Sequence, residues 1–158
     1  MTGIVKALIL VLSSFVVLSL QSFRFLNIFG IQPNLLLIFL LVVAYFVKDN
    51  KEDFLSWVFA CLLIALGAFL FVKFYLTEVI VLMVLAGGFL LWRRFLTGTI
   101  EFDLSALIFV NSIVFYAILA VWGAGPFLIK ITLIEAGLNT LIGFAVSRFF
   151  KKRNYYDR

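Results

Sequence analysis

The chain has 158 residues, of which 65% are hydrophobic and only 13% are charged. Soluble domains average roughly 45–50% apolar and about 25% charged residues, so we expect lipid to solvate most of this chain. The single cysteine, Cys61, and the lack of histidine exclude an internal disulfide, a histidine-based zinc site and a histidine-dependent nucleophile. The net charge of +5 gathers near the C-terminus, which is more typical of a cytoplasmic membrane anchor than of nucleic-acid binding.

Apolar stretches along the whole chain predict an all-α integral membrane protein, with residues 1–158 forming a single transmembrane domain. The predicted bundle has six transmembrane helices, at about residues 4–20, 34–47, 54–72, 76–92, 104–122 and 126–150. The first stretch resembles a signal peptide because Lys6 stands at its start. No small-x-small cleavage site follows it, so we expect this stretch to be retained as a helix.

The second predicted helix is the shortest. It follows residues 21–33, which are too aromatic for a flexible loop and too polar for the hydrocarbon centre, so we expect an interfacial or re-entrant segment. Pro33 has no N–H and suits the first turn of the new helix. The apolar run 35–47 has 13 residues, about 20 Å of helix. It therefore crosses a bilayer only if the membrane thins locally or the helix starts before Asn34.

Charged and turn-forming segments separate the remaining helices. Residues 48–53 interleave acidic side chains with lysines, which indicates a solvated loop rather than a metal site. Glu78 suits the start of the fourth helix, because a carboxylate there meets the positive end of the helix dipole. Arg93 and Arg94 end that helix and are expected to stop transfer, with binding of an anionic lipid headgroup as the alternative. Pro126 is expected to open the sixth helix.

The distribution of Lys and Arg predicts the orientation of the chain. With six crossings, ten of the 13 basic residues fall on the side of the two termini, namely Lys6, Lys48, Lys51, Arg93, Arg94, Arg148, Lys151, Lys152, Arg153 and Arg158. The other three, Arg24, Lys73 and Lys130, fall on the opposite side. Because cytoplasmic loops are enriched in Lys and Arg, we predict a multi-pass protein of the cytoplasmic membrane with both termini in the cytoplasm.

The sixth predicted helix carries the most informative polar residues. Glu135 lies eight residues after Phe127, about 12 Å along the helix, which places it close to the middle of the bilayer. A charged side chain there costs on the order of 2.5–3.5 kcal/mol, so Glu135 is expected to face protein. Thr132, Asn139 and Gly143 lie on the same flank, and such a small and polar seam permits close approach of another helix.

Two roles remain open for this seam. It either forms a contact surface for a partner or a polar site, or it bonds within the bundle to Asn111, Ser112 or Tyr116 of the fifth helix. Catalysis is not expected, because the sequence offers Glu135 no second intramembrane carboxylate. No phosphate-cradling loop is present either, and we predict no cofactor and no metal.

Two short segments resemble a known bacterial family. Pro33-Asn34-Leu35-Leu36-Leu37, at the start of the second predicted helix, is similar to the Pro-Asp-Leu-Leu-Leu of the rod shape-determining protein MreD family. Ile134-Glu135-Ala136-Gly137-Leu138-Asn139-Thr140, in the last predicted helix and followed by a basic tail, carries the second likeness. The chain length, the six crossings and the lack of an extramembrane domain also resemble this family.

The resemblance implies a non-catalytic membrane scaffold of the cell-elongation machinery, which organises peptidoglycan synthesis. The implied partner is an MreC-like membrane protein, with the MreB cytoskeleton and cell-wall synthases nearby. The implied fold is similar to the substrate-binding S component of energy-coupling-factor transporters.

That similarity supplies an alternative function, an S component that takes up a small solute. Two features count against it: residues 7–11 lack the Ala-x-x-x-Ala surface by which such components dock, and the predicted outer loops are poor in polar groups. A lipid-modifying membrane enzyme ranks last, since no nucleophile and base occur together.

Overall fold

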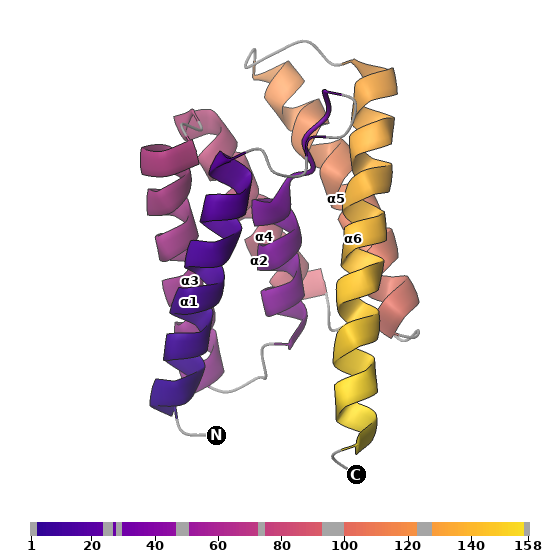
Figure 1. Ribbon diagram of the computed structural model, residues 1–158. Coiled ribbons are helices and arrows are strands. Elements are labelled where there is room, and N and C mark those ends of the chain that lie inside the picture. Colours follow the sequence, from indigo (N-terminus) through magenta and orange to yellow (C-terminus); the bar gives the residue numbers. More distant parts are fainter. Residues whose placement is uncertain are drawn as a thin grey trace.

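The part of the chain that the computed structural model describes folds into six α-helices (Figure 1). The structure describes residues 3–23, 27, 30–46, 51–72, 75–92, 100–122 and 128–156. In chain order the elements are α1 (Gly3–Ser22), α2 (Leu35–Phe46), α3 (Lys51–Gly67), the π-helical turn η1 (Ala68–Val72), α4 (Leu76–Trp92), α5 (Ile100–Val121) and α6 (Ile129–Tyr156). No strand occurs among the described residues, so the prediction of an all-helical chain with six helices is confirmed.

Three helical segments are long and apolar enough to cross a membrane. Each has 20 residues. They are Asp53–Val72, which runs through α3 and η1, Phe102–Val121 in α5 and Ile129–Arg148 in α6. Twenty residues of α-helix span about 30 Å, the thickness of the hydrocarbon core of a bilayer. The other apolar stretches among the described residues are shorter: Leu8–Ser22 in α1, Leu35–Phe46, which is α2, and Leu76–Leu91 in α4.

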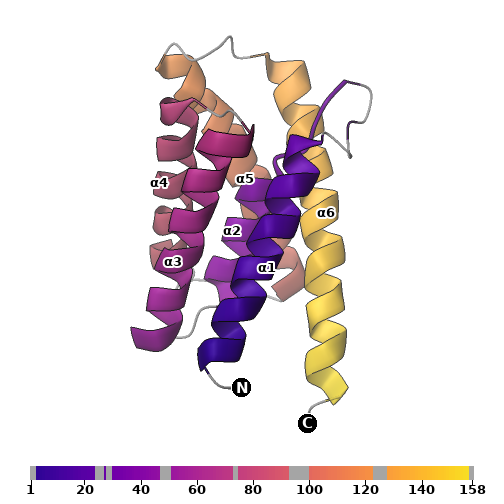
Figure 2. The same cartoon turned by 60° about the vertical axis from the view of Figure 1, so that its left-hand side comes forward.

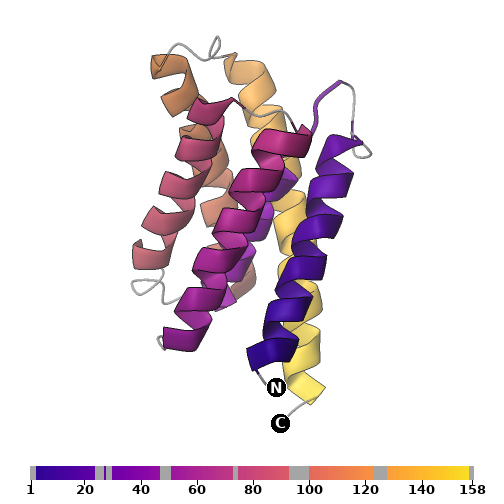
Figure 3. The same cartoon turned by 90° about the vertical axis from the view of Figure 1, so that its left-hand side faces the viewer.

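Consecutive helices run in alternating directions, so the start of α1 and the end of α6 lie at the same end of the bundle (Figures 1 and 2). The short helix α2 lies in the middle and packs against each of the other five helices. In Figure 3, α1 and α3 stand in front of α2 and cover it. The bundle is therefore built around its shortest helix.

The sequence of α2 explains its central position. Every residue from Leu35 to Phe46 is apolar or aromatic, and a helix that is hydrophobic on all sides is stable only when it is buried on all sides. Eight of its residues are buried, namely Leu35, Leu36, Leu37, Ile38, Leu40, Leu41, Val42 and Ala44. The helix begins at Leu35 and ends at Phe46, one residue inside each predicted limit, so it does not gain length by starting before Asn34. Because other helices surround it, α2 does not need the length of a lipid-facing span.

The outer surface of the bundle is apolar. Large hydrophobic side chains are exposed on α1, α3, α4 and α6, among them Leu12, Leu66, Val84 and Leu141. A contiguous apolar exterior of this kind is typical of a surface that meets lipid or another protein rather than water.

The helix limits differ from the predicted ones in two places that have a physical reason. α3 begins at Lys51 rather than Phe54, and α6 continues to Tyr156 rather than ending at residue 150. Lysine and arginine are good helix formers and are favourable near a helix C-terminus, so the basic tail prolongs α6 instead of ending it. α6 begins at Ile129, and the predicted opening residue Pro126 lies outside the described residues.

Candidate functional site

The start of α2 lies inside the bundle, where its free N–H groups need partners other than water. Asn34 is the N-cap residue: its Oδ1 accepts a hydrogen bond from the Leu37 N–H at 3.0 Å. The Leu35 N–H donates to Oε1 of Gln21, at the end of α1, at 2.8 Å. The Asn34 N–H donates to Oδ1 of Asn139, in α6, at 2.9 Å. Side chains from three segments therefore satisfy the buried end of α2.

Asn139 joins this cap to α5. While its Oδ1 accepts from Asn34, its Nδ2 donates to Oγ of Ser112 at 2.9 Å. The Ser112 hydroxyl in turn donates to the Ile108 carbonyl at 2.7 Å. Asn34 is 3% exposed, while Asn139 and Ser112 are fully buried, so this is a polar network within the protein interior.

Glu135 lies one turn before Asn139 on the same face of α6. Its Oε1 accepts a hydrogen bond from the Tyr116 hydroxyl of α5, and the residue is 5% exposed. Ser112 and Tyr116 are two of the three partners named for this seam in the alternative of bonding within the bundle, and the structure contains both bonds. Because α6 begins at Ile129, Glu135 lies only about 9 Å along the helix, nearer to the end of the bundle than predicted.

The remaining predicted residues take different places. Thr132 and Gly143 are buried on the same side of α6, and a Cβ added to Gly143 would lie 2.2 Å from Cδ1 of Ile108. Pro33 is buried and precedes the cap of α2. Asn111 donates only to the Leu107 carbonyl of its own helix, at 2.9 Å, and does not join the network.

Arg93 and Arg94 lie outside the described residues. Of the four seam residues, Glu135 and Asn139 make side-chain hydrogen bonds within the chain, towards α5 and the start of α2.

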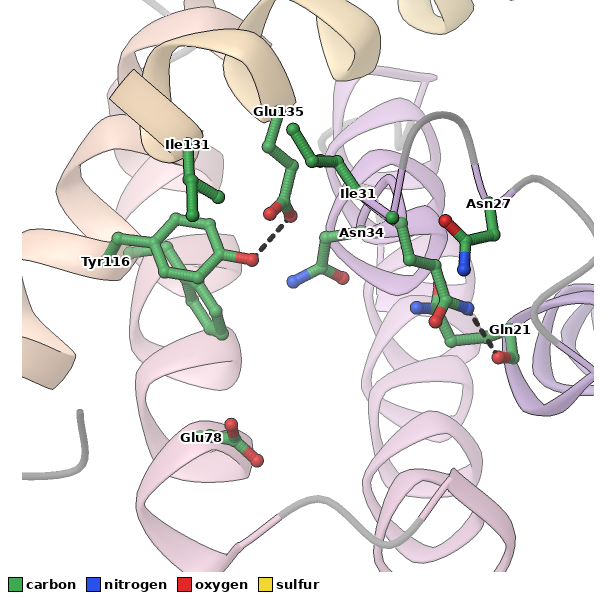
Figure 4. Close-up of a pocket in the computed structure, with 11 residues that line it drawn as sticks. Gln21, Asn27, Ile31, Asn34, Glu78, Tyr116, Ile131 and Glu135 are labelled. Carbon is green, nitrogen blue, oxygen red and sulfur yellow. Dashed lines mark hydrogen bonds between the residues drawn. The ribbon is translucent and has the colours of Figure 1, made fainter. Parts of the chain in front are cut away.

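A cavity of about 330 Å³ lies next to this network, where α1 ends, α2 and α6 begin and α5 approaches its end. Figure 4 shows the carboxyl group of Glu135 and the hydroxyl of Tyr116 pointing toward each other beside it. The described residues that line the cavity are Gln21, Asn27, Gly30, Ile31, Gln32, Asn34, Glu78, Phe115, Tyr116, Ile131 and Glu135.

Glu78, at the start of α4, is a second carboxylate in the lining of this cavity, and its place beside the same cavity as Glu135 was not predicted from the sequence. Glu78 also has the predicted role at the start of α4, where its Oε2 accepts from the Tyr75 N–H at 2.8 Å. No pattern in the sequence indicates that Glu78 and Glu135 share a cavity, since the two residues are far apart along the chain. Gln21 was also missed, and its one signal is its position as the first polar residue after the apolar run of α1.

The described residues contain no group of three or more Asp, Glu, Cys or His side chains that would hold a metal ion. The chemistry present in the cavity is a pair of carboxyl groups, a phenol and several amides. These groups are suited to binding a polar or positively charged group.

Comparison with known proteins identifies no family. No protein-family model, no curated protein and no solved structure matches this chain. The described fold and surface define a helical protein with three segments that are long and apolar enough to cross a membrane.

Proposed function

We propose that the chain is a non-catalytic membrane scaffold of the bacterial cell-elongation machinery, similar to the MreD family. One observation carries the proposal. The two segments that resemble this family, 33–37 and 134–140, lie side by side in the fold, and the Asn34 N–H donates to Oδ1 of Asn139 across 105 residues of sequence. Because the two segments contact each other, they form one structural unit of the fold. This supports the interpretation that both resemblances to the MreD family have the same cause.

The proposed scaffold crosses the cytoplasmic membrane six times, in an arrangement similar to the S component of energy-coupling-factor transporters. The alternating helices, the apolar exterior and the three segments of spanning length support this topology. Of the ten basic residues assigned to one side, those that the structure describes lie at the starts of α1 and α3 and in the C-terminal half of α6, at one end of the bundle; they are Lys6, Lys51, Arg148, Lys151, Lys152 and Arg153. Both termini are then cytoplasmic.

The proposed partner is an MreC-like membrane protein, with MreB and cell-wall synthases close by. Because Glu135 and Asn139 bond within the bundle, the partner is expected to meet the apolar outer surface or the ends of the bundle rather than the polar seam.

Co-purification from the native membrane tests this function. The tagged chain is expected to recover the MreC homologue of its host after mild detergent extraction, whereas a tagged, unrelated multi-pass protein of that host is not. Depletion of the chain is expected to make elongating cells round. Normal cell shape after depletion, together with no recovery of the MreC homologue, would contradict the scaffold proposal.

The cavity favours a second candidate function, a solute-binding S component. It lies at the end of the bundle opposite to the basic termini, which is the outer side in the proposed topology. Recovery of a coupling protein and two ATPases by the same tagged chain, in place of the MreC homologue, would favour this alternative.

A further inference from the structure

The cavity beside Glu135 has a negative bias. Its described lining contains the carboxyl groups of Glu78 and Glu135 and no lysine or arginine. The other polar groups are the Tyr116 hydroxyl and the side-chain amides of Gln21, Asn27, Gln32 and Asn34. A concave site lined by charges of one sign concentrates ligands of the opposite sign.

Each carboxyl group retains an oxygen for a ligand. The Tyr116 hydroxyl donates to Oε1 of Glu135, and the Tyr75 N–H donates to Oε2 of Glu78. No described residue donates to the second oxygen of either group. Burying the carboxylate of Glu135 costs free energy unless its oxygens accept hydrogen bonds. A hydrogen bond from a cationic donor offsets this cost best, because charge-assisted hydrogen bonds are the strongest.

The size and the apolar walls restrict the ligand further. A volume of about 330 Å³ is at the low end of the range of about 300–1,000 Å³ found for small-molecule sites. Phe115 and Ile131 add apolar surface to the lining, which suits an alkyl chain. The described lining has two carboxyl groups and does not form a group of three or more Asp, Glu, Cys or His side chains that could hold a metal ion.

We propose that this cavity binds the ammonium or guanidinium group of a small organic cation, with Glu135 as the main ion-pair partner and Glu78 as the second. The cation belongs either to a free solute or to a basic side chain of a partner protein that enters the open end of the bundle. The inference concerns the cavity alone and does not depend on the scaffold function.

Direct binding to the full-length protein in nanodiscs is the first test. The probe is cadaverine, a diamine with five carbons, and its uncharged match is 1,5-pentanediol; both are titrated by calorimetry. Cadaverine is expected to bind and the diol is not. The variant Glu135→Gln, which still accepts from Tyr116, is expected to weaken cadaverine binding at least tenfold, and Glu78→Gln several-fold.

The matched control is Asp103→Asn, which removes the same charge near the start of α5, at the opposite end of the bundle. It is expected to leave cadaverine binding unchanged. Circular dichroism and size-exclusion profiles verify that each variant is folded. Equal binding of the diol, equal binding to Glu135→Gln, or no binding of cadaverine to the folded native protein would each overturn the proposal.

Photo-crosslinking separates the two sources of the cation. A photoreactive amino acid replaces Ile131, which lines the cavity and is 45% exposed. A protein adduct in host membranes that cadaverine suppresses and Glu135→Gln abolishes assigns the cation to a partner side chain. Cadaverine binding without such an adduct assigns it to a free solute. An adduct insensitive to both changes would contradict the role of Glu135.

Discussion

Asn139 uses both halves of its side-chain amide to hold three helices together. Its oxygen accepts from the capping residue of α2 and its nitrogen donates to α5, and neither group has access to water. A buried donor or acceptor that loses its partner costs about 1–3 kcal/mol, more than the average hydrogen bond contributes. The network is therefore most sensitive at this one residue.

We expect Asn139→Ala to lower the stability of the protein in detergent by about 1–3 kcal/mol, because the Asn34 N–H and the Ser112 hydroxyl both lose a partner. The matched control is Thr140→Val on the next residue, which removes only a bond to the Ala136 carbonyl of the same helix. Thermal unfolding followed by circular dichroism measures both variants. Equal melting temperatures for the two variants would show that the network does not stabilise the fold.

At the scale of the helices, close approach depends on glycine where α6 meets α5. A Cβ at Gly143 would lie 2.2 Å from Cδ1 of the buried Ile108, whereas a Cβ at Gly137 meets no described atom within 4 Å. A Cβ at Gly67 would likewise meet Cδ1 of Leu18 at 2.2 Å, where α3 passes α1. Small residues at such contacts allow helices to pack closely in a membrane.

Gly143→Leu is expected to destabilise the bundle by about 1–3 kcal/mol, the usual cost of overpacking a filled interior. Gly137→Leu, on the same helix, is expected to have little effect because space is available there. The double variant Gly143→Leu with Ile108→Ala is expected to recover part of the loss, since it removes the atoms that clash. Thermal melting in detergent checks all three, and a larger loss for Gly137→Leu would contradict the described packing.

At the scale of the whole molecule, the charged ends of the helices decide the orientation. Of the basic residues that the structure describes, only Lys130 belongs to the end of the bundle that holds the cavity, while Lys6, Lys51 and those in the C-terminal half of α6 belong to the other end. Because Lys and Arg are retained on the cytoplasmic side, the cavity is expected to face outward.

Reporter fusions measure this orientation. Alkaline phosphatase joined after Trp122 is expected to be active, and the same enzyme joined after Arg158 is expected to be inactive. A fluorescent protein joined after Arg158 is expected to fluoresce, because it folds in the cytoplasm. The reverse pattern would place the cavity in the cytoplasm and would remove the support for an outward-facing site.

The sequence by itself determined the helical class and the number of helices, because apolar runs of this length must form helices to satisfy their peptide groups in lipid. It also pointed to Glu135 and Asn139, since polar residues in such a run need partners, but it left open whether those partners are Asn111, Ser112 or Tyr116 of the same bundle or groups of another molecule.

Only the tertiary structure decided the central place of α2, the role of Gln21 in its cap and the meeting of Glu78 with Glu135 in one cavity. The physical reason is that these contacts join segments far apart along the chain. Local hydrophobicity and helical periodicity carry no information about which helix lies next to which.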